Sequence, residues 1–408
     1  MSDLIKDLTA AKDGLYNDDL LVLLQNSSDA KLRGTVLDFF GVLEWKGAEQ
    51  IAMGLVDDRD NLDSDLVSSA LSYLAEIRSK DALKFTDAII KEDNRKLLPA
   101  LVRLMGRAGG TAEEELLLGW FDSDSATPAL KEEAIKALGE IGSGKAADRL
   151  DKLIQDPGAG KAARMFACDS LARIKDPASV APLIKAATDA DPNVRCSAID
   201  ALGAFASGGD EAACREIAEA LRDSFVKARV EACKAAAAGK VRQALPFLRY
   251  KAQSDPDMAV RTEACRSLAA MGESADSADA SFAFLRERLE DTKEDSGLRA
   301  LCFGLLARYD PTGSMPILQA RLMTEAAAKQ RDFYTALARE IAYADKAPLI
   351  GALARMLLSD QDYLIRVAAI EWIRKNKALD LKPDLERLTI QDPSDMIRRR
   401  ATEALKVF

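Results

Sequence analysis

The stretch that decides the fold is Asp191–Phe205, DPNVRCSAIDALGAF, because its pattern returns along the chain. Residues 255–271 read DPDMAVRTEACRSLAAM, and residues 131–142 read KEEAIKALGEIG. In each segment an alanine follows a basic residue after three positions, and a leucine follows that alanine after four. Spacings of three and four residues place side chains on one face of an α-helix. The recurrence therefore predicts a helix that the chain uses repeatedly.

The repeat becomes regular when this alanine is taken as the anchor of each unit. Equivalent anchors recur at intervals of 31 to 38 residues, at Val36, Ala70, Leu101, Ala134, Ala167, Ala198, Ala232, Ala264, Cys302, Leu337, Ala369 and Ala401. Twelve such units span nearly the whole chain. A fixed period of this length is typical of a solenoid, in which each unit is stabilised by its neighbours.

Each unit contains signals for two helices. An Asp-Pro pair precedes the second helix in four units, at residues 156, 191, 255 and 392, and aspartate favours a helix cap while proline favours the first turn. A further proline opens the first helix in five units, at Pro182, Pro246, Pro316, Pro348 and Pro383. No segment alternates with a period of two, so no strand is expected. The sequence thus predicts an all-α superhelix of about twelve helix pairs, with a loop inserted at Gly272–Ser281.

An arginine three residues before the anchor is the most regular polar feature of the repeat. It occurs at Arg33, Arg164, Arg195, Arg229, Arg261, Arg299, Arg366 and Arg398. At about 100° per residue this position lies on the apolar, buried side of the helix, where a cation needs a partner. Turn aspartates are the expected partners: Asp191 for Arg195, Asp257 for Arg261, Asp362 for Arg366 and Asp395 for Arg398. We interpret the arginine as a structural residue that joins stacked units.

The pattern D-x-x-x-R-x-x-A-x-x-x-L in paired helices resembles the HEAT repeat family, in particular its short bacterial HEAT-like form, over residues 28–408. The resemblance implies that the first helix of each pair lies on the convex side. It also implies that the arginine-bearing helix lies on the concave side. The concave wall would then comprise helices near 30–45, 64–77, 95–107, 130–141, 162–174, 194–206, 228–238, 260–271, 298–308, 364–375 and 396–407.

Charge divides the chain into two regions of one predicted solenoid, 1–408. Residues 1–130 hold 14 Lys and Arg against 24 Asp and Glu, whereas residues 131–408 hold 43 against 42. An acidic N-terminal region argues against nucleic-acid binding, which needs a basic surface. The chain has no histidine and its six cysteines form no C-x-x-C pair, so neither a metal nor a cofactor is expected.

The sequence also bears on where in the cell the protein is found. The first residues, MSDLIKDLTAAKDGLYNDDL, are acidic and lack the long apolar core of a signal peptide. No window is long and apolar enough for membrane insertion, and the cysteines occupy small-residue positions typical of buried thiols. We expect a cytoplasmic monomer, while removal of an export signal stays open as an alternative.

The candidate partner-binding residues are those at positions −1 and +2 from the anchor, which should face the concave side. They are Arg103, Lys136, Phe166, Asp169, Asp200, Lys234, Arg266, Leu301 and Arg400. Their charges are mixed, which suits either a solvated face or a groove that matches the charges of one partner. Phe166 and Leu301 are the apolar candidates for anchoring that partner.

Three functions remain to be weighed. The resemblance implies a non-enzymatic scaffold or adaptor that binds a protein along its concave face. The alternative is an enzyme or lyase subunit, because some HEAT-like proteins resemble subunits of bilin lyases. However, no motif for nucleophilic, phosphate or metal chemistry is present. The last is a DNA-binding protein similar to the HEAT-like glycosylases that act on alkylated bases, which the acidic N-terminal region disfavours.

Overall fold

The computed structural model describes residues 5, 8–9, 14–92, 94–272, 278–328, 331–343 and 354–408. Regular structure in these ranges is entirely helical and includes no strand, which confirms the all-α prediction. The chain divides into two compact units, Met1–Glu216 and Ile217–Phe408, and the division falls within α14 (Glu211–Ala220). This division does not coincide with the change in charge after residue 130.

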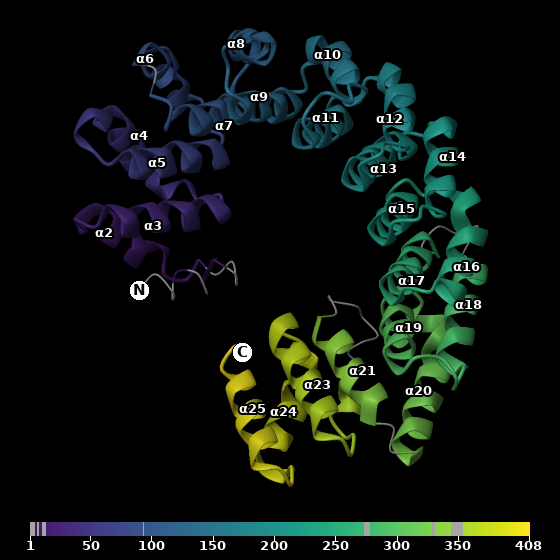
Figure 1. Ribbon diagram of the computed structural model, residues 1–408. Helices are drawn as coiled ribbons and strands as arrows, with labels where there is room; N and C mark the ends of the chain where they lie inside the picture. Colours follow the sequence, from purple (N-terminus) through teal and green to yellow (C-terminus); the bar gives the residue numbers. More distant parts are fainter. Residues whose placement is uncertain are drawn as a thin grey trace. The chain divides into compact units, whose positions relative to one another are not determined.

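Unit 1 consists of two rows of helices (Figure 1). The inner row holds α3 (Ala30–Val42), α5 (Ser64–Glu76), α7 (Leu98–Ala108), α9 (Pro128–Ile141), α11 (Lys161–Ile174) and α13 (Pro192–Ala206). The outer row holds α2 (Asn17–Asn26), α4 (Glu49–Asp57), α6 (Thr86–Glu92), α8 (Thr111–Asp122), α10 (Gly144–Ile154) and α12 (Val180–Ala186). Each inner helix packs against the next inner helix and against the outer helix that precedes it in sequence.

Unit 2 repeats this arrangement. Its inner row holds α15 (Val226–Ala238), α17 (Met258–Gly272), α19 (Ser296–Tyr309), α21 (Arg331–Tyr343), α23 (Tyr363–Asn376) and α25 (Asp395–Leu405). Its outer row includes α16 (Leu245–Ser254), α18 (Ala278–Glu290), α20 (Pro311–Ala328) and α24 (Lys382–Gln391). The arginine-bearing helices are therefore the inner helices of both units, as the resemblance to the HEAT repeat family implies.

The inner helices begin where the sequence provides a cap. Asp191 accepts a hydrogen bond from the Asn193 N–H at 2.8 Å, and α13 starts at the following proline, as predicted from the Asp-Pro pair. The same prediction is wrong for the pairs at 156, 255 and 392, because α11 begins at Lys161, α17 at Met258 and α25 at Asp395. Asp255 and Asp392 have another role, described below.

Neighbouring inner helices approach closely because the facing residues are small. A Cβ atom added at Gly139 of α9 would lie 2.7 Å from the Ser170 Cα of α11, closer than real Cβ contacts. The Ser170 hydroxyl donates a hydrogen bond across the same contact to the Ile135 carbonyl at 2.9 Å. In unit 2, the Ser267 hydroxyl likewise donates to the Cys233 carbonyl at 2.8 Å. Position +3 of one inner helix thus contacts the preceding helix, and position +1 faces the following one.

The predicted loop at 272–281 is wrong at both of its ends. Helix α17 extends to Gly272 and α18 begins at Ala278, so the last four residues of the predicted loop are helical. Residues 273–277 lie outside the described ranges. The tenth unit is formed by α20 and α21, and its anchor Leu337 is fully buried.

Candidate partner-binding surface

The inner face of each unit is a strip of residues two positions after the anchor. In the inner helices the anchors are buried. The +2 residues are exposed or half-buried, at Asp38, Ser72, Arg103, Lys136, Asp169, Asp200, Lys234, Arg266, Gly304, Arg339, Glu371 and Glu403. The neighbouring inner helices and the outer helix cover the other sides. The helical angles calculated from sequence therefore place the +2 row correctly.

In unit 1, contacts between adjacent inner helices hold several of these side chains. Arg103 donates to the Ser72 hydroxyl at 3.3 Å. Lys136 pairs with Glu133 on its own helix, and its Nζ lies 4.7 Å from the centre of the Phe166 ring. Phe166 is half-buried, so it both packs on the preceding repeat and presents part of its ring. The surface from α7 to α11 thus combines the guanidinium of Arg103 and the ammonium of Lys136, both fixed by contacts with neighbouring side chains, with the aromatic ring of Phe166.

Next to Phe166 the inner face becomes acidic. Asp169 on α11 is half-buried, and Asp200 on α13 is exposed. Burial raises the pKa of Asp169, and the charge of Asp200 raises it further, while Arg173 opposes both effects. The pKa of Asp38 is also raised by burial, against a hydrogen bond from Ser69 and the charge of Arg103. Cationic groups of a partner would be favoured here because they relieve this repulsion.

In unit 2, the predicted cations are paired within the surface. Lys234 lies 3.2 Å from Glu231, and Arg266 lies 3.6 Å from Glu263, each pair on one helix. Arg400 on α25 donates to Glu371 on α23 at 3.3 Å and remains more than half exposed. These three side chains are on the inner face, as expected, but carboxylates already neutralise much of their charge.

Leu301 does not belong to the exposed surface, and its prediction as an exposed anchor is wrong. Its side chain is only 3% exposed, because α19 lies between α17 and α21. Gly304, one turn further on, allows Glu340 of α21 to approach within 3.2 Å of where a Cβ would be. The missing side chain at +2 thus lets α21 lie close against this part of α19. Leu301 is a core residue.

Four of the repeated arginines, Arg164, Arg229, Arg261 and Arg366, join consecutive repeats as predicted, but through partners other than those expected. Arg229 forms two hydrogen bonds of 2.9 Å with Asp255, whose side chain is fully buried. Equivalent pairs join Arg164 to Asp189 at 2.6 Å, Arg366 to Asp392 at 3.0 Å, and Arg261 to Glu294 at 2.5 Å. In each pair the carboxylate belongs to the following repeat, 25 to 33 residues later.

The expected turn aspartates instead cap their own helices. Asp191, Asp257 and Asp362 each accept a hydrogen bond from a backbone N–H two residues later. A cap satisfies the orphan donors of the first turn, so its carboxylate is directed toward its own helix and away from the arginine. The pair of Arg398 with Asp395 agrees with the prediction.

A sequence signal for three of these partners, Asp189, Asp255 and Asp392, exists and was missed. An aspartate stands six residues before the arginine in five units, at Asp189, Asp223, Asp255, Asp360 and Asp392. The side chain of each accepts a hydrogen bond from the N–H two residues later, a typical turn contact. The carbonyl groups of Asp189, Asp223, Asp360 and Asp392 accept from the arginine of the same unit. The motif D-x5-R therefore marks the junction between repeats.

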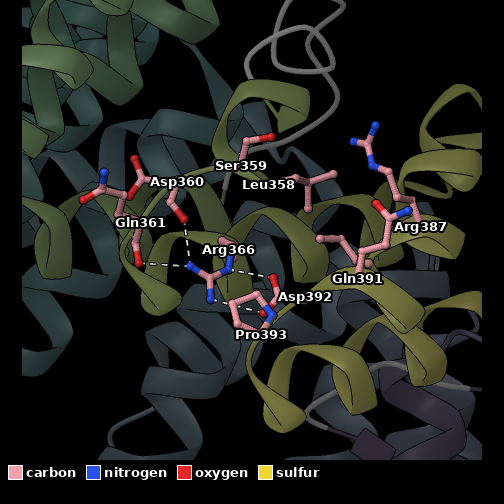
Figure 2. A pocket seen from close by; sticks show the side chains of 10 residues that line it. Leu358, Ser359, Asp360, Gln361, Arg366, Arg387, Gln391, Asp392 and Pro393 are labelled. Carbon is pink, nitrogen blue, oxygen red and sulfur yellow. Dashed lines mark hydrogen bonds and ion pairs between the residues drawn. The ribbon is translucent and has the colours of Figure 1, made fainter.

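A pocket of about 530 Å³ lies at one of these junctions in unit 2. Figure 2 shows Arg366 at its centre, between Asp392 on one side and the Asp360 and Gln361 carbonyls on the other. Burial raises the pKa of Asp360, while its hydrogen bond from the Asp362 N–H lowers it. Because Asp392 and the two carbonyl groups already bind the Arg366 guanidinium, we interpret the pocket as part of the junction between repeats and not as a ligand site.

Among the described residues, no three Cys, Asp or Glu side chains are grouped as metal ligands. Of the cysteines, Cys214 is half-buried, and the rest are buried at Cys168, Cys196, Cys233, Cys265 and Cys302. Burial raises the pKa of Cys168 and of Cys233 to about 12, so both thiols stay protonated at neutral pH. No described helix has the length and apolar character needed to span a bilayer.

Comparison with known proteins agrees with this architecture. The family model described as spirochaete HEAT repeat protein matches residues 1–404, whereas no curated protein matches the chain in sequence. Yeast importin-β, Kap95p, is similar in structure with a TM-score of 0.51 and 13% identity, over 98% of this chain and 60% of that one. The CpcE–CpcF complex of phycocyanin lyase from Nostoc sp. PCC7120 matches with a TM-score of 0.36 and 17% identity, over 72% of this chain and 93% of that one.

The structural similarity to Kap95p supports the stacked helical fold. This chain spans about three fifths of the length of Kap95p.

Proposed function

Because the chain belongs to the family of spirochaete HEAT repeat proteins, we propose that it is a non-enzymatic scaffold that binds a protein partner along its inner helices. The observation that carries this proposal is the +2 strip together with Phe166 at position −1. Arg103 and the Lys136–Phe166 pair are held by contacts between repeats, and Lys234 and Arg266 are held by glutamates on their own helices. Side chains that are already ordered lose little entropy when a partner binds. A row of such positions suits an extended partner surface.

The strip in unit 1 also indicates where the partner would be held. Phe166 of α11 offers an apolar contact beside Lys136 of α9. Asp169 of α11 and Asp200 of α13 offer negative charge. We place a basic and apolar segment of the partner across α9, α11 and α13. An aromatic residue flanked by charges is a frequent centre of binding energy at protein interfaces.

The paired cations argue against nucleic acid as the partner. Lys136, Lys234 and Arg266 each have a glutamate within the same helix, so phosphate would have to displace that carboxylate. Affinity for nucleic acid depends on the release of counterions by unpaired cations. No catalytic group is assigned on this surface, and the scaffold proposal requires none.

The test uses three full-length proteins to capture partners from native extract, with identification by mass spectrometry. The first is the wild type, and the second carries Arg103→Glu, Lys136→Glu, Lys234→Glu and Arg266→Glu on inner helices. The third reverses four exposed cations away from the inner helices: Lys152→Glu, Lys185→Glu, Arg215→Glu and Arg222→Glu. Both variants change the net charge by the same amount, and circular dichroism checks their helicity.

We call the second protein the inner-face variant and the third the outer-row variant. We expect one protein to be captured by the wild type and by the outer-row variant, and not by the inner-face variant. Purified, that protein should bind the Phe166→Ala variant at least tenfold more weakly, since truncating a central aromatic anchor typically costs about 2 kcal/mol or more. Equal capture by all three proteins would place binding outside the inner face. Loss of binding only with the outer-row variant would contradict the proposal directly.

A further inference from the structure

A second pocket of unit 2, of about 580 Å³, lies between the inner helices α23 and α25. Val367 of α23 and Val407, which follows α25, give it an apolar lining, and Val407 is 38% exposed. The other side chains that line it are charged. Pockets that bind ligands typically combine an apolar lining with a few polar groups, in volumes of about 300–1,000 Å³. This part of the inner face is therefore shaped to receive a group from outside.

The charges in this pocket do not balance. Arg374 donates to Glu371 on its own helix at 2.9 Å, and Arg400 of α25 donates to the same glutamate at 3.3 Å. Lys406 donates to Glu403 at 2.8 Å. Three cations thus face two carboxylates, and the two guanidinium groups share one of them. The excess of positive charge favours an anionic group in the pocket.

Arg400 is the cation whose donors are least used. In α9, α15 and α17 the inner-face cation stands at +2 and pairs with a glutamate at −1 of the same helix. Helix α25 reverses this order, because arginine occupies −1 and glutamate occupies +2. Arg400 reaches across to Glu371 instead, in a single 3.3 Å hydrogen bond, and its side chain is 56% exposed. Most of the five N–H donors of this guanidinium therefore have no partner among the described residues.

We propose that this pocket binds a carboxylate side chain of the protein partner, together with an aliphatic side chain beside it. The inference rests on the proposed function, because it assigns part of that partner to α23 and α25. The carboxylate would accept paired, charge-assisted hydrogen bonds from Arg400, a geometry that guanidinium groups favour. The aliphatic side chain would cover Val367 and Val407 and the methylene stems of the cations.

A peptide segment fits this pocket better than a free anion does, because the anionic and the apolar contacts lie side by side in one hollow. The chemistry is also the reverse of that across α9, α11 and α13, where Asp169 and Asp200 favour a basic segment. The inner face of unit 2 would therefore select an acidic and aliphatic part of the partner.

The test measures binding of synthetic peptides to the full-length protein by fluorescence anisotropy. The probe is the hexapeptide ALEELA, amidated at its C-terminus and labelled at its N-terminus with a neutral fluorophore. We expect ALQQLA, which has amides in place of the carboxylates, to bind about tenfold more weakly, the effect of losing one charge-assisted hydrogen bond. ASEESA, which keeps the carboxylates and lacks the aliphatic side chains, should also bind more weakly.

Three variants locate the binding. Arg400→Gln should weaken ALEELA about tenfold. The matched control, Arg387→Gln, removes an outer-row arginine of similar exposure that pairs with Asp384 three residues earlier, and it should leave binding unchanged. Glu371→Gln should strengthen binding, because Arg374 and Arg400 lose the carboxylate that they share. A gain of affinity cannot come from misfolding, so this variant keeps the test decisive.

The pocket and the proposed function can fail separately, because the inner-face variant changes residues on α7, α9, α15 and α17 only. The pocket assignment is overturned if ALEELA does not bind, if ALQQLA binds equally well, or if Arg400→Gln and Arg387→Gln bind ALEELA alike. Any of these results, with a partner still captured through the inner face, contradicts the pocket alone. Binding of ALEELA at Arg400 with no captured partner contradicts the proposed function and supports the pocket.

Discussion

Replacing Asp255 by asparagine should destabilise unit 2 more than any surface substitution, because it leaves a buried guanidinium without its carboxylate. Asp255 is fully buried and accepts two hydrogen bonds of 2.9 Å from Arg229, one of 3.0 Å from the Asp257 N–H and one of 3.1 Å from Lys251. Asparagine has nearly the same shape, so little packing is lost. Its amide group, however, would direct N–H donors at the donors of Arg229.

The magnitude follows from the contacts. Burial opposes ionisation of Asp255, but the hydrogen bonds from Arg229, Asp257 and Lys251 outweigh it and lower the pKa. The folded state therefore favours the charged carboxylate, and that stability is present above the unfolded-state pKa and lost as pH falls through the folded value. Breaking one side of a buried ion pair typically costs about 3–5 kcal/mol, which is the loss we expect at pH 7.

The assay is urea unfolding at pH 7, combined with hydrogen exchange of peptides from α15 and α17. Local exchange is needed because repeat proteins do not always unfold in one cooperative step. The matched control is Glu219→Gln, which breaks the exposed pair with Arg222 and should cost at most about 1 kcal/mol. If the two variants lose the same free energy of unfolding, the junction has no special energetic role and the argument fails.

Three further predictions concern packing and charge. Gly139→Ala should lower the free energy of unfolding by about 1–3 kcal/mol because its Cβ would clash with Ser170; Gly119→Ala, with open space at its Cβ, should not destabilise, and urea melts of both check this. Ser267→Ala should cost about 1 kcal/mol in the same assay, because it removes a buried hydrogen bond to the Cys233 carbonyl, and an unchanged melt would contradict this role. Asp169→Asn should raise the urea midpoint at pH 7 and have less effect near pH 4. The raised pKa of Asp169 means that the fold favours the protonated form, so its favourable contribution is present below the unfolded-state pKa and lost as pH rises through the folded value. A midpoint lowered at pH 7 would show the opposite.

The repeat and its helices could be predicted from the sequence because they depend on local interactions. The arginine–alanine–leucine spacing located the inner helices, and the structure has them at α13 and α17 within a few residues of the expected bounds. The +2 register also predicted which residues lie on the inner face instead of in the core, as for Lys136 and Asp200. Helix periodicity alone determines these angles.

Contacts between repeats were decided only by the tertiary structure. Arg229 could have paired with several turn carboxylates, and the stacking of the next repeat brought Asp255 into its range. Leu301 was predicted to be exposed, but the approach of α21 over Gly304 covers that part of α19. A single helix specifies the angle of each side chain, whereas the distance and direction of its neighbours depend on how whole helices pack.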